Sequence, residues 1–193
     1  MRKVINRVFP FLLAVVMLLS MVGCGESSVT DDGKIKIPHS AAVYEGDNYI
    51  EVVEELQKLL ADIQVFYTNL RGFHWNVKGK QFFMLHEKFE EIYDDMNEKA
   101  DEVAERILML GHTPANNYSE YLKISEIKEV SGVTEGKAIL GMILDSFRKL
   151  MIRERKVLTL AGEVNDEVTV AVMSDYLKAQ EKTVWMLVAT LDD

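Results

Sequence analysis

Two pairs of potential metal ligands lie within residues 74–107, each pair spaced by about one turn of a helix. His86 precedes Glu90 by four positions, and Asp101 precedes Glu105 by the same interval. Side chains four positions apart project from one side of an α-helix. Imidazole and carboxylate groups, with no thiolate among them, suit iron, manganese or zinc. The spacing therefore predicts a helix that carries two separate two-ligand faces for a metal.

The two pairs are too far apart to bind one ion within one subunit. Fifteen positions separate His86 from Asp101, which corresponds to roughly 22 Å along a helix. If the helix meets a second copy of itself antiparallel across a two-fold axis near Asp95, the first pair of one chain comes level with the second pair of the other. The sequence therefore predicts a metal site between subunits, present twice in each dimer.

Two other interpretations of these residue types compete with the shared site. Acidic residues at helical intervals usually form a solvated face, and this interpretation applies to Asp94, Asp95, Glu98 and Glu102. A di-iron site inside a single four-helix bundle normally needs Glu-x-x-His pairs on two helices. The residues three positions before the four histidines are Lys36, Arg71, Phe83 and Met109. Because none of them is a glutamate, the site between subunits is the better account.

The run FHWNVKGKQFFMLHEKFEEIYDDMNEKADEVAERI, residues 73–107, resembles the signature of the Dps family, the small ferritins that form dodecameric shells. The resemblance extends over about residues 47–193 and includes the late segment DYLKAQEKTVWMLVATL. It implies an all-α, ferritin-like four-helix bundle with one long crossover that carries a short helix. It also implies a homo-oligomer, a dodecamer built from two-fold dimers.

The resemblance also implies which residues bind the metal. In that family, one subunit provides the histidine of the HW pair, the histidine of LHE and the carboxylate four residues later, which here are His74, His86 and Glu90. The facing subunit provides the acids of DEVAER, here Asp101 and Glu105. Many members have aspartate at the position of Glu90. The glutamate keeps a hard oxygen ligand but holds it on a longer arm.

The function implied is ferroxidation followed by iron storage. Two Fe²⁺ ions would be oxidised at each di-iron site, with hydrogen peroxide as the preferred oxidant, and the ferric mineral would collect inside the shell. Trp75, beside His74, is a candidate for intercepting stray oxidising equivalents. Asp166 and Glu167 occupy the place where family members line iron-entry pores, although acids at a turn more often cap a helix. Trp185 is expected in the core or an interface.

Hydrophobic periodicity predicts the elements that position these residues. Apolar residues at three- and four-residue intervals indicate helices over about residues 48–76 and 81–110. A short helix is expected near residues 118–123, inside a long polar connection. Further apolar residues from Ile139 to Leu158 indicate a third long helix that ends near Gly162 and Asn165, and a fourth follows over about residues 166–191. One long crossover between the second and third long helices is typical of ferritin-like bundles.

The first residues predict export and a lipid anchor. Arg2, Lys3 and Arg7 precede an apolar run over residues 8–22, which is short for a membrane span and typical of a secretory signal. Met21, Val22 and Gly23 lead to Cys24 in a pattern that resembles the lipobox of bacterial lipoproteins. We therefore expect a signal peptide over residues 1–23, acylation of Cys24 and a flexible tether over residues 24–46. The mature protein would be extracytoplasmic and held at a membrane by its lipid.

The charge balance argues against a nucleic-acid partner. The chain has 22 basic and 31 acidic residues, and removal of the signal peptide deletes three basic residues and no acid, so the net charge falls from −9 to −12. Binding to phosphates requires clustered Lys and Arg. The tether offers only Lys34 and Lys36, and the sequence finishes with Asp192 and Asp193. DNA binding is therefore not expected.

The sequence is also compatible with two alternative functions. The chain could form a lipid-anchored structural shell that binds metal with little turnover, so that iron or zinc only stabilises its dimers. It could also be a DNA-protecting member of the family, which would require residence in the cytoplasm.

Overall fold

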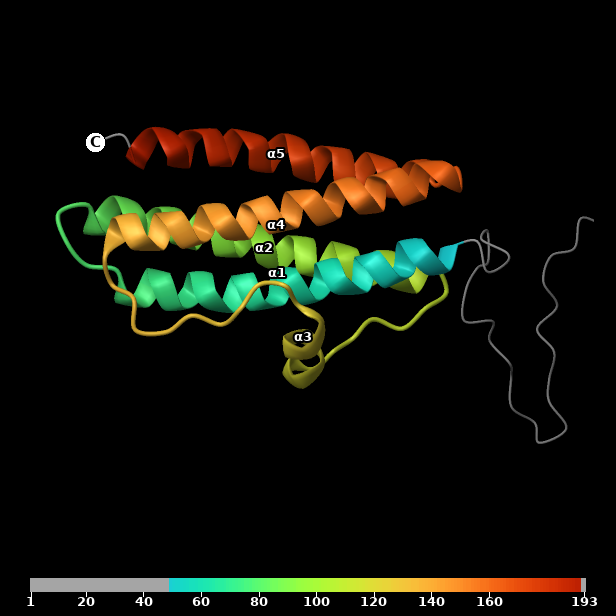
Figure 1. The fold of residues 1–193 in the computed structure, drawn as a ribbon, viewed down its shortest axis with the longest axis horizontal. Helices are drawn as coiled ribbons and strands as arrows, with labels where there is room; N and C mark the ends of the chain where they lie inside the picture. The colour runs from blue at the N-terminus through green and yellow to red at the C-terminus, as the bar shows by residue number, and fades with distance from the viewer. Residues whose placement is uncertain (1–48, 192–193) are drawn as a thin grey trace, which may run out of the picture. The chain divides into compact units, whose positions relative to one another are not determined.

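The computed structural model describes residues 49–191, and these contain five α-helices (Figure 1). Their bounds are α1 Ile50–Asn76, α2 Phe82–Met109, α3 Tyr118–Ile124, α4 Gly136–Glu163 and α5 Glu167–Leu191. The predicted signal peptide over residues 1–23, the tether over residues 24–46 and Cys24 lie outside the described residues. Within residues 49–191, no helix combines the length and the apolar character needed to cross a membrane.

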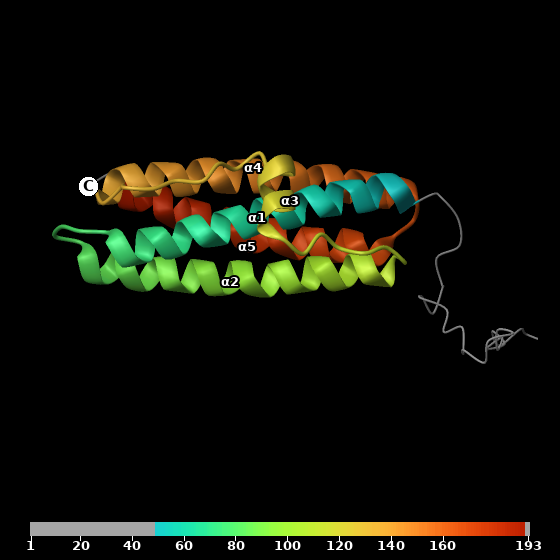
Figure 2. The ribbon, with the colours of Figure 1, turned by 90° about the horizontal axis from the view of Figure 1, so that it is seen from below.

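The four long helices lie side by side as two hairpins (Figures 1 and 2). Helix α1 packs on α2, α4 packs on α5, and contact between α1 and α4 joins the two hairpins. The chain returns from the end of α2 to the start of α4 through a long crossover, and α3 within it packs against α1. The predicted all-α four-helix bundle with one long crossover and a short helix is confirmed.

The apolar faces of the long helices meet in a closed core. Phe66, Phe89 and Phe147, which come from α1, α2 and α4, are each at most 1% exposed. The rings of Phe66 and Phe147 pack edge to face with centroids 5.3 Å apart, an arrangement favoured by the ring quadrupoles. The burial of these periodic apolar positions explains why the helical pattern read from the sequence holds.

Helix α4 begins three residues before the first apolar position of its pattern, because Glu135 caps it. The Glu135 carboxylate accepts hydrogen bonds from the backbone N–H groups of Lys137 (2.9 Å) and Ala138 (2.7 Å), which are otherwise without partners at a helix start. Gly136 then passes close to α2, since a Cβ there would lie 2.7 Å from a methyl carbon of Leu85. The start of α4 is thereby held against the same end of α2 that carries His86.

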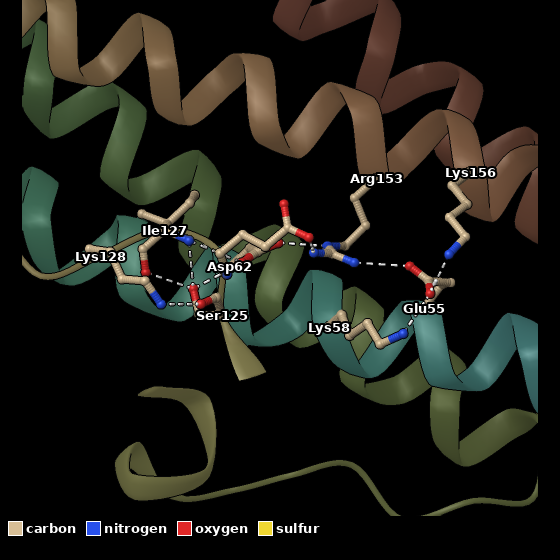
Figure 3. Close-up of polar contacts among 9 residues, drawn as sticks. Glu55, Lys58, Asp62, Ser125, Ile127, Lys128, Arg153 and Lys156 are labelled. Carbon is tan, nitrogen blue, oxygen red and sulfur yellow. Dashed lines mark hydrogen bonds and ion pairs between the residues drawn. The ribbon is translucent and has the colours of Figure 1, made fainter. Parts of the chain in front are cut away.

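A buried ion-pair network joins the crossover to the bundle (Figure 3). The guanidinium of Arg153 on α4 donates to Asp62 (2.6 Å) and Glu55 (2.9 Å) of α1. The other oxygen of Asp62 accepts from the hydroxyl of Ser125 (2.9 Å) and the backbone N–H of Glu126 (2.7 Å), just after α3. Asp62 therefore accepts hydrogen bonds from α4 through one carboxylate oxygen and from the crossover through the other.

Glu55 stays ionised in this network despite its burial. Burial alone would raise the pKa of its carboxyl group, but hydrogen bonds and charge from Lys156 (2.8 Å) and Lys58 (2.7 Å) outweigh that effect and hold the pKa at about 2. Arg153 adds a third cationic partner. The network is thus a set of paired charges, and the loss of one member would leave others unpaired.

Candidate metal centre

His74 and His86 are fixed in place by each other's backbone. His74 lies in the last turn of α1 and His86 near the start of α2, on either side of the turn that contains Gly79 (φ +114°). Nδ1 of His74 lies 2.8 Å from the carbonyl oxygen of His86, and Nδ1 of His86 lies 2.8 Å from the carbonyl oxygen of His74. The two rings stack with centroids 3.7 Å apart. This reciprocal arrangement sets the positions of both imidazoles before any ligand binds.

The same hydrogen bonds determine which nitrogen can bind a metal. A carbonyl oxygen only accepts hydrogen bonds, so Nδ1 of each ring must carry the proton. Nε2 of each ring then keeps its lone pair. Metal-binding histidines characteristically donate their other ring N–H to a carbonyl or a carboxylate in this way. Both imidazoles are therefore prepared to bind through Nε2.

Glu90 completes the group of ligands that one chain brings together. It follows His86 by one turn of α2, and ligand atoms of His74, His86 and Glu90 all lie within 4.8 Å of one another. His74 is buried, His86 is half-buried and Glu90 is exposed, so the group opens toward the outer face of α2. Three ligands leave coordination positions free for further groups.

Asp101 and Glu105 are not part of this group in one chain. Both are exposed on α2, and His86 and Asp101 belong to one uninterrupted helix, so the fifteen residues between them span roughly 22 Å. In the described part of the chain, the three-ligand group of α1 and α2 is the one cluster with metal-binding geometry. The structure thus bears out the separation argued from the sequence, while the sharing of ligands between subunits stays a prediction.

Trp75 is exposed beside this group, with 63% of its surface accessible. The guanidinium of Arg71 lies 4.8 Å from the centroid of its ring, within the range of a cation–π contact. A role in intercepting oxidising equivalents stays a prediction. Trp185, expected in the core or an interface, is 68% exposed and therefore does not belong to the core of one subunit.

Asp166 is buried at the start of α5 and caps that helix. Its carboxylate accepts from the backbone N–H of Thr169 (3.0 Å) and from the guanidinium of Arg106 (2.7 Å) on α2. Burial raises the pKa of Asp166, but these partners outweigh it and the pKa is lowered. Glu167 is exposed. The structure thus places Asp166 in the capping role, and the participation of either acid in a pore between subunits stays a prediction.

Tyr93 is a residue at this centre that the sequence reasoning missed. Its hydroxyl donates to Glu90 (3.2 Å), and its ring packs edge-on against the ring of His74 with centroids 5.5 Å apart. The available signal was its position three residues after Glu90, which puts both on one side of the helix.

Comparisons with known proteins show which family of domains carries this group of residues. The family model described as a ferritin-like domain matches residues 53–193. A DNA protection during starvation protein of Porphyromonas gingivalis is 52% identical over 138 residues, which cover 72% of this chain and 87% of the relative. An uncharacterized protein of Haemophilus influenzae is 54% identical over 139 residues, with the same coverage. The crystal structure of a Dps protein from Vibrio cholerae, described as a member of a broad superfamily of ferritin-like diiron-carboxylate proteins, superimposes with a TM-score of 0.73. It is 49% identical and covers 75% of this chain and 91% of that chain.

Proposed function

This chain belongs to the Dps family of ferritin-like proteins, and from that premise we propose that it is a ferroxidase and iron-storage protein. It oxidises Fe²⁺ at di-iron sites shared between subunits and stores the ferric product inside a dodecameric shell. The observation that carries the proposal is the group formed by His74, His86 and Glu90. Its two imidazoles present free Nε2 atoms beside a carboxylate, and it lacks the remaining oxygen ligands that a di-iron carboxylate site requires.

The exposed residues of α2 support an antiparallel dimer in one particular register. A two-fold axis between Asp95 and Met96 brings His86 level with Glu105 of the partner subunit, and Glu90 level with Asp101 of the partner subunit. The same axis brings Phe83 level with the partner's Leu108. Phe83 is 84% exposed and Leu108 is 52% exposed in the single chain. One register thus completes the metal site and covers two apolar side chains that one chain leaves in water.

The ligand set suits the chemistry of iron oxidation. Fe²⁺ is the substrate, and imidazole together with carboxylate binds iron well. Anionic oxygen ligands such as Glu90, with Asp101 and Glu105 of the partner subunit, favour the ferric state. Two ions in one site provide two electrons together, so that one hydrogen peroxide and two protons become two water molecules while two Fe²⁺ become two Fe³⁺. Paired electron transfer avoids the release of hydroxyl radical, which is why we propose hydrogen peroxide as the oxidant.

We also propose that the mature protein is an extracytoplasmic lipoprotein. The support is the sequence of the N-terminal segment, in which basic residues, an apolar run and the Met21 to Cys24 pattern follow each other. Cys24 would carry the lipid, and residues 24–46 would tether the shell to a membrane. The acidic balance of the chain would attract Fe²⁺ toward the shell.

DNA protection is a second candidate function, favoured by the name of the P. gingivalis relative. The net charge of −9 argues against it, because affinity for DNA comes largely from Lys and Arg that displace counterions. Fractionation of cells with lipid labelling separates the candidates: a labelled chain in the membrane fraction supports the lipoprotein. An unlabelled cytoplasmic chain that shifts duplex DNA at low salt supports DNA protection.

The ferroxidase proposal is tested by loading the purified protein with Fe²⁺ without oxygen and then adding hydrogen peroxide. Ferric iron held by oxygen ligands has an absorption band in the near ultraviolet, by which its formation can be followed. We expect this band to grow promptly, and we expect replacement of His86 or Asp101 to abolish its growth. A flat trace in the unchanged protein would instead support a shell that binds metal for structural reasons.

A further inference from the structure

Tyr93 touches two of the three metal-ligand side chains that one chain brings together. We propose that Tyr93 is a positioning residue that holds the carboxylate of Glu90 beside the two imidazoles. The inference rests on the proposed function of the site, since it assumes that Glu90 binds metal. It goes further by assigning the control of that ligand to a specific neighbour.

Such a residue is needed because the side chain of Glu90 is flexible. Glutamate has one more rotatable bond than aspartate, and its carboxylate loses more conformational freedom when it is fixed on a metal. Glu90 is exposed, so the packing of the core does not restrict it. The hydroxyl of Tyr93 donates to Oε1 of Glu90 over 3.2 Å. This hydrogen bond favours the side-chain conformations of Glu90 that keep its carboxylate beside His74 and His86.

Tyr93 can hold Glu90 only because its own ring is held. One edge contact joins it to His74, with centroids 5.5 Å apart and an interplanar angle of 90°. A second joins it to Tyr67 on α1, at 5.9 Å and 87°. The guanidinium of Arg71 lies 5.6 Å from the centre of the Tyr67 ring. A ring fixed on two sides by α1 presents its hydroxyl in a constant direction, as the support of a functional ligand requires.

A double-mutant cycle between Tyr93→Phe and Glu90→Asp tests this inference. The full-length protein is titrated with Co²⁺, whose visible absorption reports its ligands, and each variant is compared with the unchanged chain. Tyr93→Phe keeps the ring contacts and removes the hydroxyl. We expect it to lower the Co²⁺ affinity roughly 10-fold, the smallest loss that is typical when a hydrogen-bond partner of a metal ligand is removed. In the Glu90→Asp background the shorter arm does not reach the hydroxyl, so Tyr93→Phe should change affinity less than about 2-fold.

Tyr118→Phe is the matched control, since Tyr118 is an exposed tyrosine on α3 and its hydroxyl loss should leave Co²⁺ binding unchanged. Equal losses from Tyr93→Phe in both backgrounds, or no loss in either, would overturn the positioning role. Failure of the Co²⁺ titration in the unchanged protein would overturn it together with the site. If Co²⁺ binds with the expected coupling but Fe²⁺ is not oxidised, the positioning role stands and the ferroxidase proposal fails.

A second inference rests on a different part of the molecule, the packing of α4 against α5. Glu154 is 0% exposed and Gln180 is 2% exposed. The amide nitrogen of Gln180 donates to Oε1 of Glu154. Within the described residues, Oε2 of Glu154 and Oε1 of Gln180 are buried without a hydrogen-bond partner. We infer that Glu154 carries a proton on Oε2 and donates it to Oε1 of Gln180, so that an acid and an amide form a closed pair.

One proton on Glu154 gives both unpaired oxygen atoms a hydrogen-bond partner. The charged groups around Glu154 are compatible with this proton. Lys99 on α2 and Arg155 on α4 favour the ionised form of Glu154, whereas Asp95 on α2 opposes it. Lys99 is itself paired with Asp95 and lies 4.9 Å from the centre of the Tyr176 ring on α5. The α1 carboxylates on the side of Arg153 are paired with that residue. Burial is the largest influence and raises the pKa of Glu154 to about 7.

This proton makes the stability of the subunit depend on pH in a defined direction. In the unfolded chain the pKa of Glu154 has its ordinary value of 4.5, whereas burial in the folded chain raises this pKa to about 7. The contribution is therefore complete below the lower value and is lost as the pH rises through the upper one. Over this window it amounts to as much as about 300-fold in the unfolding equilibrium constant.

Glu154→Gln tests the pair, because a second amide can donate to Gln180 as the protonated acid does but cannot ionise. Unfolding is measured across the window at fixed protein concentration, with Glu163→Gln, an exposed site on α4, as the control. We expect the Glu154 variant to lose the pH-dependent component and to be the more stable protein above about pH 7. The infrared carbonyl band of a buried carboxylic acid should also be present in the unchanged protein and absent from the variant. Identical pH profiles, or no such band, would overturn the inference.

Discussion

Replacement of His86 with alanine is expected to reduce the initial rate of Fe²⁺ oxidation by at least roughly 100-fold. Removal of a residue that only hydrogen-bonds to a metal ligand already lowers metal affinity or activity by about 10- to 100-fold, and His86 is itself a ligand. The change removes one Nε2 ligand and also the Nδ1 donor to the carbonyl of His74. His74 keeps its own bond to the backbone carbonyl at position 86, so the fold of the turn should survive. The rate is measured from the ferric absorbance after Fe²⁺ and hydrogen peroxide are combined.

His112→Ala is the matched control for that experiment. His112 is exposed and follows α2, outside the group of ligands, so its replacement should leave the rate within about 2-fold, as for sites that do not touch one another. An undiminished rate in the His86 variant would contradict the assignment of the site. A circular dichroism spectrum unchanged from that of the original protein would show that a lost rate reflects the site and not the fold.

Replacement of Arg153 with alanine is expected to lower the free energy of unfolding by about 3–5 kcal/mol, the cost of removing one partner of a buried ion pair. Arg153 is 7% exposed and pairs with Glu55 and Asp62, which are 3% and 0% exposed. Without the guanidinium, the Asp62 carboxylate keeps only its hydrogen bonds to the crossover. Chemical denaturation at fixed protein concentration measures the loss.

Arg155→Ala separates this effect from a general loss of positive charge on α4. Arg155 is two residues away, is exposed, and pairs with the exposed Glu181 over 2.7 Å, a kind of surface pair that contributes at most about 1 kcal/mol. Equal losses from the two replacements would contradict a special role for the buried network. A smaller loss at Arg153 than at Arg155 would contradict it more strongly.

The long helices could be predicted because each buries a periodic apolar face. The pattern that ends at Asn76 and the pattern that ends before Gly111 match the ends of α1 and α2 within one or two residues. The apolar pattern of α4 begins at Ile139, three residues inside the helix, because the helix starts at the polar cap Glu135, which lies outside that pattern. Apolar periodicity identifies the buried face of a helix but does not locate polar capping residues.

The metal ligands could be predicted from residue types at helical intervals. The hydrogen bonds that fix the two imidazole rings for binding could not. Reciprocal bonds between His74 and His86 depend on how the turn between α1 and α2 closes, which spacing alone does not determine. The same holds for Arg153 and Asp62, which meet across 91 residues of sequence. Partners of this kind are chosen by tertiary packing, and the sequence offers many charged residues that could have filled either role.

No single chain completes the site, and this property can be tested by mixing two inactive variants. His86→Ala and Asp101→Asn are each expected to be inactive alone, because every site of each dimer lacks one ligand. When equal amounts are unfolded and refolded together, about half of the dimers contain one chain of each kind. In those dimers one site lacks both ligands and the other is intact. We expect the refolded mixture to recover about a quarter of the original Fe²⁺ oxidation rate. If the mixture recovers no rate at all, the site is not shared between subunits.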